Sequence, residues 1–201
     1  MGVTFDSHLS FDKHIDNFCH ACYFYIRRLR HVHSAMLADT TKIIVCIVVS
    51  SRLDYCNGTT RRHVRIHPGQ TSMCPKYPRP LVTELRRRNH ITPALKKLHW
   101  LPIPARITFK VVTVVYYLRE RQQPPYLADL ISDYIRMRTL RSSTETLLAE
   151  QSFRTNISCR SCRYVATKTW NNIPDDIKIV DSLGLFQNGL KTFLFRQSYC
   201  C

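Results

Sequence analysis

The chain has 201 residues, of which 44% are hydrophobic, so it is long and apolar enough to bury a core, which argues against wholesale disorder. Only 5 residues are glycine, and neither of the common glycine-rich phosphate loops is present. Thirty lysines and arginines face 14 acidic residues. The net charge of +16 indicates a polyanionic partner, most often RNA or DNA and less often an anionic membrane surface; the alternative is a solvated basic surface.

The first fifty-odd residues predict a strand and two helices. Residues 2–6 (GVTFD) alternate and favour β-structure, which predicts a short strand or hairpin. Asp12 can cap the helix that follows. Its apolar face repeats at three- and four-residue steps: Ile15, Phe18, Cys22, Ile26 and Leu29. A second helix is predicted from 40 to about 55, and its centre, IIVCIVV, is apolar all round and expected to be buried.

The middle of the chain contains an irregular insert and then returns to helical patterns. Residues 58–82 contain four prolines and no regular period, which predicts a loop or a disordered insert. A Thr92 cap followed by Pro93 predicts a helix to residue 99. A longer helix is predicted from residue 104 to about 123. Its expected buried stripe is Ile107, Val111, Val114, Val115 and Leu118.

The remainder predicts three more helices. A short one follows residue 125, with Tyr126, Leu127 and Leu130 inward. Residues 136–158 are polar, with short strands expected at 139–141 and 147–149. A helix at 160–170 precedes a turn at 171–174. The last helix, 182–195, has the apolar face Leu183, Phe186, Leu190, Phe193 and Leu194. The fold class expected is therefore mainly α.

Asp175 and Asp176 are the one pair of adjacent carboxylates in this last region. Polymerase carboxylates lie in an aromatic-x-Asp-Asp turn between two strands, where they clamp divalent ions. Here the pair follows Pro174 and precedes Ile177. Proline at a first helical position with acids in the first turn predicts a helix start, so we assign the pair no catalytic role.

Two Cys-x-x-Cys pairs, Cys19/Cys22 and Cys159/Cys162, raise the alternative of a zinc site. They lie far apart in the sequence, unlike the short spacing of zinc modules. Buried or free thiols are therefore the favoured interpretation. The N-terminal residues do not resemble a signal peptide, so we expect an intracellular, reducing setting with mostly free cysteines.

Clusters of basic residues are the candidate functional residues. Arginine and lysine neutralise phosphates and give affinity without sequence preference. The nucleic-acid-binding candidates are Arg27, Arg28, Arg30, Arg86, Arg87, Arg88, Lys96 and Lys97. Aromatic residues could stack on bases: Tyr23, Tyr25, Trp100, Tyr116 and Tyr117. Trp100, inside the apolar LHWLP, is more typical of a core residue.

Five segments together resemble the C-terminal part of the reverse transcriptase of non-LTR retrotransposons, of the jockey-like and chicken-repeat-like kinds. These are GVTFDSHLSFDKHIDNFC, SRLDYCN, HITPALKKLHWLPIPARITFKVVTVVYYL, PPYLADLI and TWNNIPDDIKIVDSLGLFQNGLKTFLF. The resemblance covers most of the chain except residues 58–82. It implies the end of the palm and the helical thumb at 1–57, an insert at 58–83, and the region after the thumb at 84–201.

The resemblance also suggests an origin for the insert. Family members continue after Asp-Tyr-Cys-Asn with a helical segment similar to K-L-Q-R-V-Q-N-x-L-A. One back-translation of residues 70–80, with codons chosen freely, gives R-L-Q-C-V-Q-N-T-L-A when read one base later. Our hypothesis is that residues 58–82 are a frame-shifted stretch, which the genomic nucleotides would test.

The family's palm carboxylates have no counterpart in this sequence, so no catalytic residue is carried over. We expect a catalytically inactive remnant of a retrotransposon RNA-directed DNA polymerase that binds RNA or DNA through its basic residues. We expect no cofactor, no metal, no small-molecule substrate and no membrane partner. The longest apolar stretch, 43–49, is far shorter than the ~20 residues that cross a bilayer. The alternative function is a zinc-stabilised nucleic-acid-binding module on the two cysteine pairs.

Overall fold

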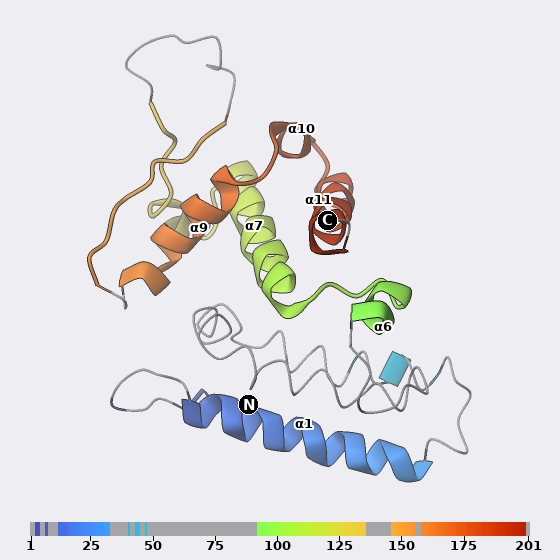
Figure 1. Cartoon of the computed structure of the whole chain (residues 1–201). Coiled ribbons are helices and arrows are strands. Elements are labelled where there is room, and N and C mark those ends of the chain that lie inside the picture. Colours follow the sequence, from blue (N-terminus) through green and yellow to red (C-terminus); the bar gives the residue numbers. More distant parts are fainter. Residues whose placement is uncertain are drawn as a thin grey trace. The chain divides into compact units, whose positions relative to one another are not determined.

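The computed structural model describes residues 3–4, 7, 12–32, 40, 43–44, 47, 92–135, 146–155 and 158–199. The chain divides into two compact units, Met1–Ile103 and Pro104–Cys201. Across the described residues seven α-helices and one 3-10 helix have defined bounds, and none of these residues is in a strand (Figure 1). The prediction of a mainly α fold is confirmed.

The first unit contains α1 (Asp12–Val32) and α6 (Thr92–Lys97). Both lie where the sequence predicts helices, although α6 begins at the predicted cap and ends two residues early. Of the predicted N-terminal strand only Val3 and Thr4 are described, and neither is in a strand. The backbone N–H of Thr4 instead donates to Nδ1 of His14 at 3.4 Å.

Four residues of the predicted second helix are described, and all four are helical: Thr40, Ile43, Ile44 and Ile47. Ile43 and Ile47 are 59% and 62% exposed. These two side chains are therefore exposed, although the segment was expected to be buried on several sides. The insert at 58–83 lies outside the described residues, as do the predicted strand at 139–141 and residues 84–88.

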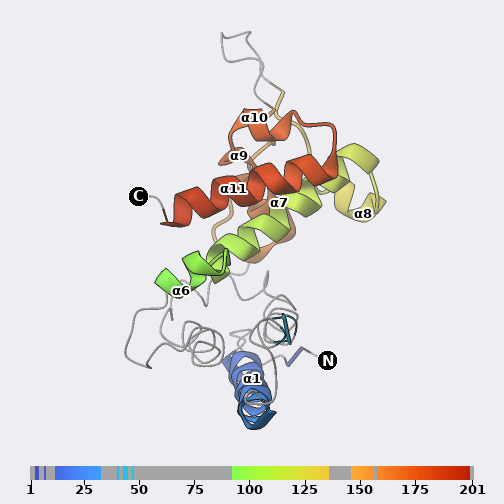
Figure 2. The same cartoon turned by 90° about the vertical axis from the view of Figure 1, so that its right-hand side faces the viewer.

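The second unit contains most of α7 (Ile103–Arg121), followed by α8 (Pro125–Ala128), the 3-10 helix η2 (Ser158–Arg160), α9 (Cys162–Asn171), α10 (Asp175–Lys178) and α11 (Leu183–Tyr199). Helix α11 runs beside α7, as Figure 2 shows from the side. The buried residues come chiefly from α7, α9 and α11, so these three helices build the core.

A stack of aromatic side chains lies where α7, α9 and α11 meet. The rings of Tyr116 on α7 and Phe186 on α11 are stacked with centroids 4.1 Å apart. The ring of Trp170, at the end of α9, lies 6.3 Å from Phe186. Trp170 and Phe186 are 1% and 0% exposed, so each buries nearly its whole surface. Burial on this scale is worth roughly 1.5–3 kcal/mol for a large apolar side chain.

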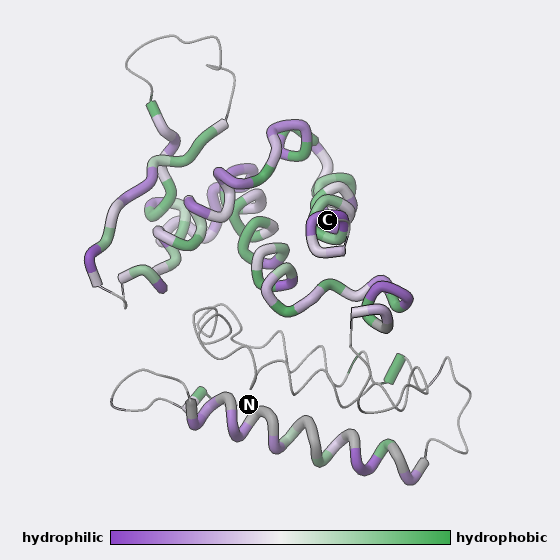
Figure 3. Tube along the Cα trace, in the orientation of Figure 1, coloured by the Kyte–Doolittle hydropathy of each residue, from purple (hydrophilic) through white to green (hydrophobic). Residues whose placement is uncertain are grey.

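The buried face of α7 differs from the predicted stripe. Ile107, Val115 and Leu118 are buried as expected, but Val114 is 42% exposed, while Val112 is buried completely. Helix α7 contacts α11 through Tyr116 and α9 through Arg119, so its buried arc is wide. Figure 3 shows hydrophobic and polar residues alternating along α7. The sequence shows that α7 has apolar residues, but it does not show that two different helices, α9 and α11, pack against it.

Two further side chains also point away from their predicted faces. Tyr126 on α8 is 70% exposed and Leu183 at the start of α11 is 39% exposed, although both were predicted to lie inward. Each lies in the first turn of its helix. The rest of the α11 face is confirmed at Phe186, Leu190 and Leu194.

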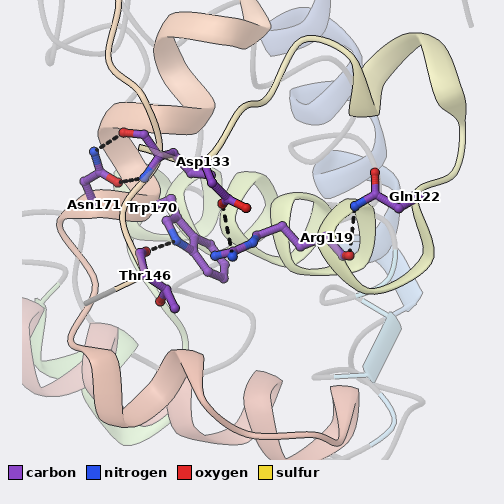
Figure 4. Close-up of polar contacts among 7 residues, drawn as sticks. Arg119, Gln122, Asp133, Thr146, Trp170 and Asn171 are labelled. Carbon is purple, nitrogen blue, oxygen red and sulfur yellow. Dashed lines mark hydrogen bonds and ion pairs between the residues drawn. The ribbon is translucent and has the colours of Figure 1, made fainter. Parts of the chain in front are cut away.

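The side chain of Asn171 pairs with the backbone of an extended segment. Its Oδ1 accepts from the Leu148 N–H at 2.9 Å, and its Nδ2 donates to the Leu148 carbonyl at 3.0 Å (Figure 4). On its other side Leu148 forms an antiparallel bridge with Asp133. The strand predicted at 147–149 is thus reduced to this isolated bridge, with an amide side chain in place of a third strand.

Ionisation of Tyr116 should lower the stability of this core at alkaline pH. Burial, with the nearby carboxylates of Glu120 and Asp181, raises the pKa of its hydroxyl above the ordinary value. The hydroxyl donates to the Val180 carbonyl. A raised native pKa means that the stabilisation is complete below about pH 10 and is lost as the pH rises through the native pKa.

We therefore predict that Tyr116→Phe lowers the free energy of unfolding by about 1 kcal/mol at pH 7, through the lost hydrogen bond. The same change should make stability fall less steeply above about pH 10. Urea unfolding from pH 7 to 11 measures both effects. Tyr117→Phe, at the exposed neighbour, is the matched control and should leave both unchanged; an equal response from it would contradict the assignment.

Candidate nucleic-acid interface

Helix α1 presents a polar, mainly basic face to solvent. Its exposed positions repeat at three- and four-residue steps: Lys13, Asp16, Asn17, His20, Phe24, Arg27, Arg28 and His31. This spacing places them along one side of a helix. The face carries three permanent cations, two histidines and one carboxylate. It is therefore a surface that attracts phosphates.

An aromatic ring lies in the middle of this face. Phe24 is 52% exposed, and the guanidinium carbon of Arg28 lies 4.7 Å from its ring centroid. Tyr25 meets the Phe24 ring edge to face, with centroids 5.6 Å apart. Exposed rings beside arginines can stack on unpaired bases while the cation contacts the backbone. Sequence reasoning overlooked Phe24, although the four-residue step from Phe24 to Arg28 signals the pairing.

The predicted basic residues fall into two groups. Arg27 and Arg28 are exposed in the C-terminal turns of α1, and Lys96 and Lys97 are exposed in the last turn of α6. Arg30 belongs to α1, but its side chain lies outside the described residues, as do Arg86, Arg87 and Arg88. The structure therefore describes the side chains of four of the eight predicted basic residues, and all four are exposed.

The aromatic candidates divide between surface and core. Tyr117 is 40% exposed, but its neighbour Tyr116 is only 4% exposed and stacks on Phe186. Tyr116 therefore cannot stack on a base, and its inclusion among the stacking candidates was wrong. Tyr25 and Trp100 are partly buried. The side chain of Tyr23 is not among those described.

The adjacent acids Asp175 and Asp176 lie in the first turn of α10, with Pro174 as the capping residue. The Lys178 ammonium donates to the Asp175 carboxylate at 2.9 Å, and only 2% of the lysine side chain is exposed. The pair begins a helix, as the sequence predicts, and one acid neutralises a buried cation.

Two cysteine side chains are described, Cys159 and Cys162, and both are free thiols. The thiol of Cys159 donates weakly to the Phe153 carbonyl at 3.8 Å. Cys162 begins α9 and is exposed as a residue, yet desolvation of its sulfur raises the pKa of the thiol. A thiol that stays protonated is a poorer metal ligand. Cys19 and Cys22 lie on α1, and their side chains are outside the described residues, so the zinc alternative stays a prediction.

A small pocket of about 120 Å³ lies at the C-terminal end of α7. Its charged lining residues, Arg119 and Asp133, form an ion pair at 3.1 Å (Figure 4). The Arg119 guanidinium carbon also lies 5.3 Å from the centre of the Trp170 ring. Because these two charges neutralise each other, the pocket offers no unbalanced charge to an anion.

No known protein family, curated protein or solved structure matches this chain. Among the described residues there is no cluster of three or more histidine, cysteine or acidic side chains that could hold a metal ion. No described helix is both long enough and apolar enough to cross a bilayer.

The structural role of the acid pair gives a matched test. Asp175→Ala leaves the buried Lys178 ammonium without its carboxylate, so we expect the free energy of unfolding to fall by about 2 kcal/mol. Asp176→Ala removes the same charge from the same turn but no ion pair, and should cost about 0.5 kcal/mol. Urea midpoints at pH 7 compare the two variants. Equal losses would show that the Lys178 contact does not stabilise the fold.

Proposed function

We propose that this chain is a catalytically inactive remnant of a retrotransposon RNA-directed DNA polymerase that retains sequence-nonspecific binding to RNA or DNA. The observation that carries the binding proposal is the exposed basic face of α1. Its resemblance to the thumb of these polymerases, a segment that grips nucleic acid, agrees with that face.

The charges on α1 favour phosphates for a simple reason. Arg27 and Arg28 lie in the last turns of the helix, where the dipole favours cations, and both side chains are exposed. Only Asp16 opposes them on the exposed face. Each phosphate they neutralise releases condensed counterions, which gives an affinity that falls steeply with salt.

The proposal that the chain is inactive is supported by the sequence positions and contacts of its carboxylates. The sequence has no aromatic-x-Asp-Asp turn between strands, and its one adjacent acid pair begins a helix and binds Lys178. A two-metal polymerase site needs carboxylates that are free to hold divalent ions. We therefore propose that this chain alone does not extend a primer.

The test is a filter-binding titration of the full chain against single-stranded RNA at several salt concentrations. We expect affinity to fall linearly on logarithmic axes, and Arg27→Gln with Arg28→Gln to reduce the slope by about 1.4, since each single-strand phosphate contact contributes about 0.7. The control, Lys191→Gln with Arg196→Gln, removes two exposed charges from α11.

A slope that is insensitive to salt, or an equal loss in the α11 control, would contradict the assignment of binding to α1. Primer extension by the wild-type chain would separately contradict the proposal that it is inactive. Circular dichroism of each variant establishes that the helices remain formed.

A further inference from the structure

The solvent side of α7 carries a second row of cationic and aromatic side chains. Lys110, Val114, Tyr117 and Arg121 follow one another at steps of four, three and four residues and are all exposed. This spacing aligns them along the helix, opposite the face that packs against α9 and α11. We call these four residues the α7 stripe. It spans roughly 16 Å, at about 1.5 Å per residue.

Tyr117 is the centre of the α7 stripe. Tyr117 is 40% exposed as a residue, and the guanidinium carbon of Arg121 lies 5.6 Å from its ring centroid. Val114, one turn earlier, is 42% exposed and extends the apolar surface beside the ring. Lys110 and Arg121 place one positive charge at each end. Glu120, an exposed acid on the flank, cancels one of these two charges, so the surface keeps a net positive charge.

The same local arrangement occurs on two other helices. Arg28 lies over Phe24 on α1, and the ammonium of Lys168 lies 5.4 Å from the ring centroid of Tyr164 on α9. In each case the cation follows the ring by four residues, the spacing at which helical side chains touch. A cation–π contact at an exposed site is weak, about 0.5–1 kcal/mol, so fold stability gives little reason to keep the rings of Phe24 and Tyr117 at the surface.

We infer that the α7 stripe is a separate binding site for single-stranded nucleic acid, in which Tyr117 stacks on an unpaired base and Lys110 and Arg121 contact the flanking phosphates. Stacking on a side chain requires a base that is free of its own duplex, which favours single strands. The length of the stripe suits a few nucleotides. This inference rests on the proposed function, but it assigns binding to the second unit, independently of α1.

The test uses the full chain and fluorescence anisotropy with two labelled probes. One is a 12-nucleotide oligouridylate, and the other is an abasic oligonucleotide of equal length and charge. In the Arg27→Gln, Arg28→Gln background, we expect Tyr117→Ala to weaken oligouridylate binding about fivefold or more, because a stacked base is lost. Binding of the abasic probe should not change. Tyr117→Phe keeps the ring and should retain affinity.

Tyr126→Ala is the matched control, because Tyr126 is a more exposed tyrosine on α8, outside the stripe. It should leave both probes unaffected. If Tyr117→Ala binds both probes as the background does, or loses both equally, the inference is overturned while binding at α1 stands. If the wild-type chain binds neither probe, the proposed function fails as well. Urea unfolding of Tyr117→Ala identifies any loss that comes from misfolding.

Discussion

The second unit depends on the burial of one indole. Trp170, in the last turn of α9, packs against Phe186 of α11 and lies beneath the guanidinium of Arg119 from α7, so a single side chain joins all three core helices. Its Nε1–H donates to the Thr146 carbonyl at 3.0 Å, which satisfies the one polar atom that burial would otherwise leave unpaired. Lys178 of α10 also approaches the ring, at 5.8 Å.

The fold was predictable where one periodicity dominates. Helices α9 and α11 begin within two residues of their predicted starts, and a regular apolar face marks α11 in the sequence. The core face of α7 was not predictable, because apolar residues surround much of this helix. Only the packing of α9 and α11 against it leaves Val114 exposed. The pairing of Leu148 with Asn171 was also unpredictable, because it joins residues 23 apart through a side chain.

The basic residues of the candidate interface could be predicted from the sequence, but the aromatic side chains that lie beside them at the surface could not. Runs of arginine and lysine identified Arg27, Arg28, Lys96 and Lys97, and all four are exposed. Which aromatic side chains reach solvent follows from helix packing, so Tyr116 and Tyr117 could not be separated without it. Described positive charges thus lie on the exposed faces of α1, α6 and α7, while the adjacent acids stabilise a helix start.

The amide of Asn171 has a consequence for association between chains. An extended segment with one unpaired edge can recruit a strand from another molecule and so begin an aggregate. Asn171 occupies the N–H and carbonyl of Leu148 on the edge opposite Asp133, and it also donates to the Glu150 carboxylate at 2.9 Å. At Leu148 the segment therefore has no backbone group left for a foreign strand, so one side chain acts as a stop against sheet growth.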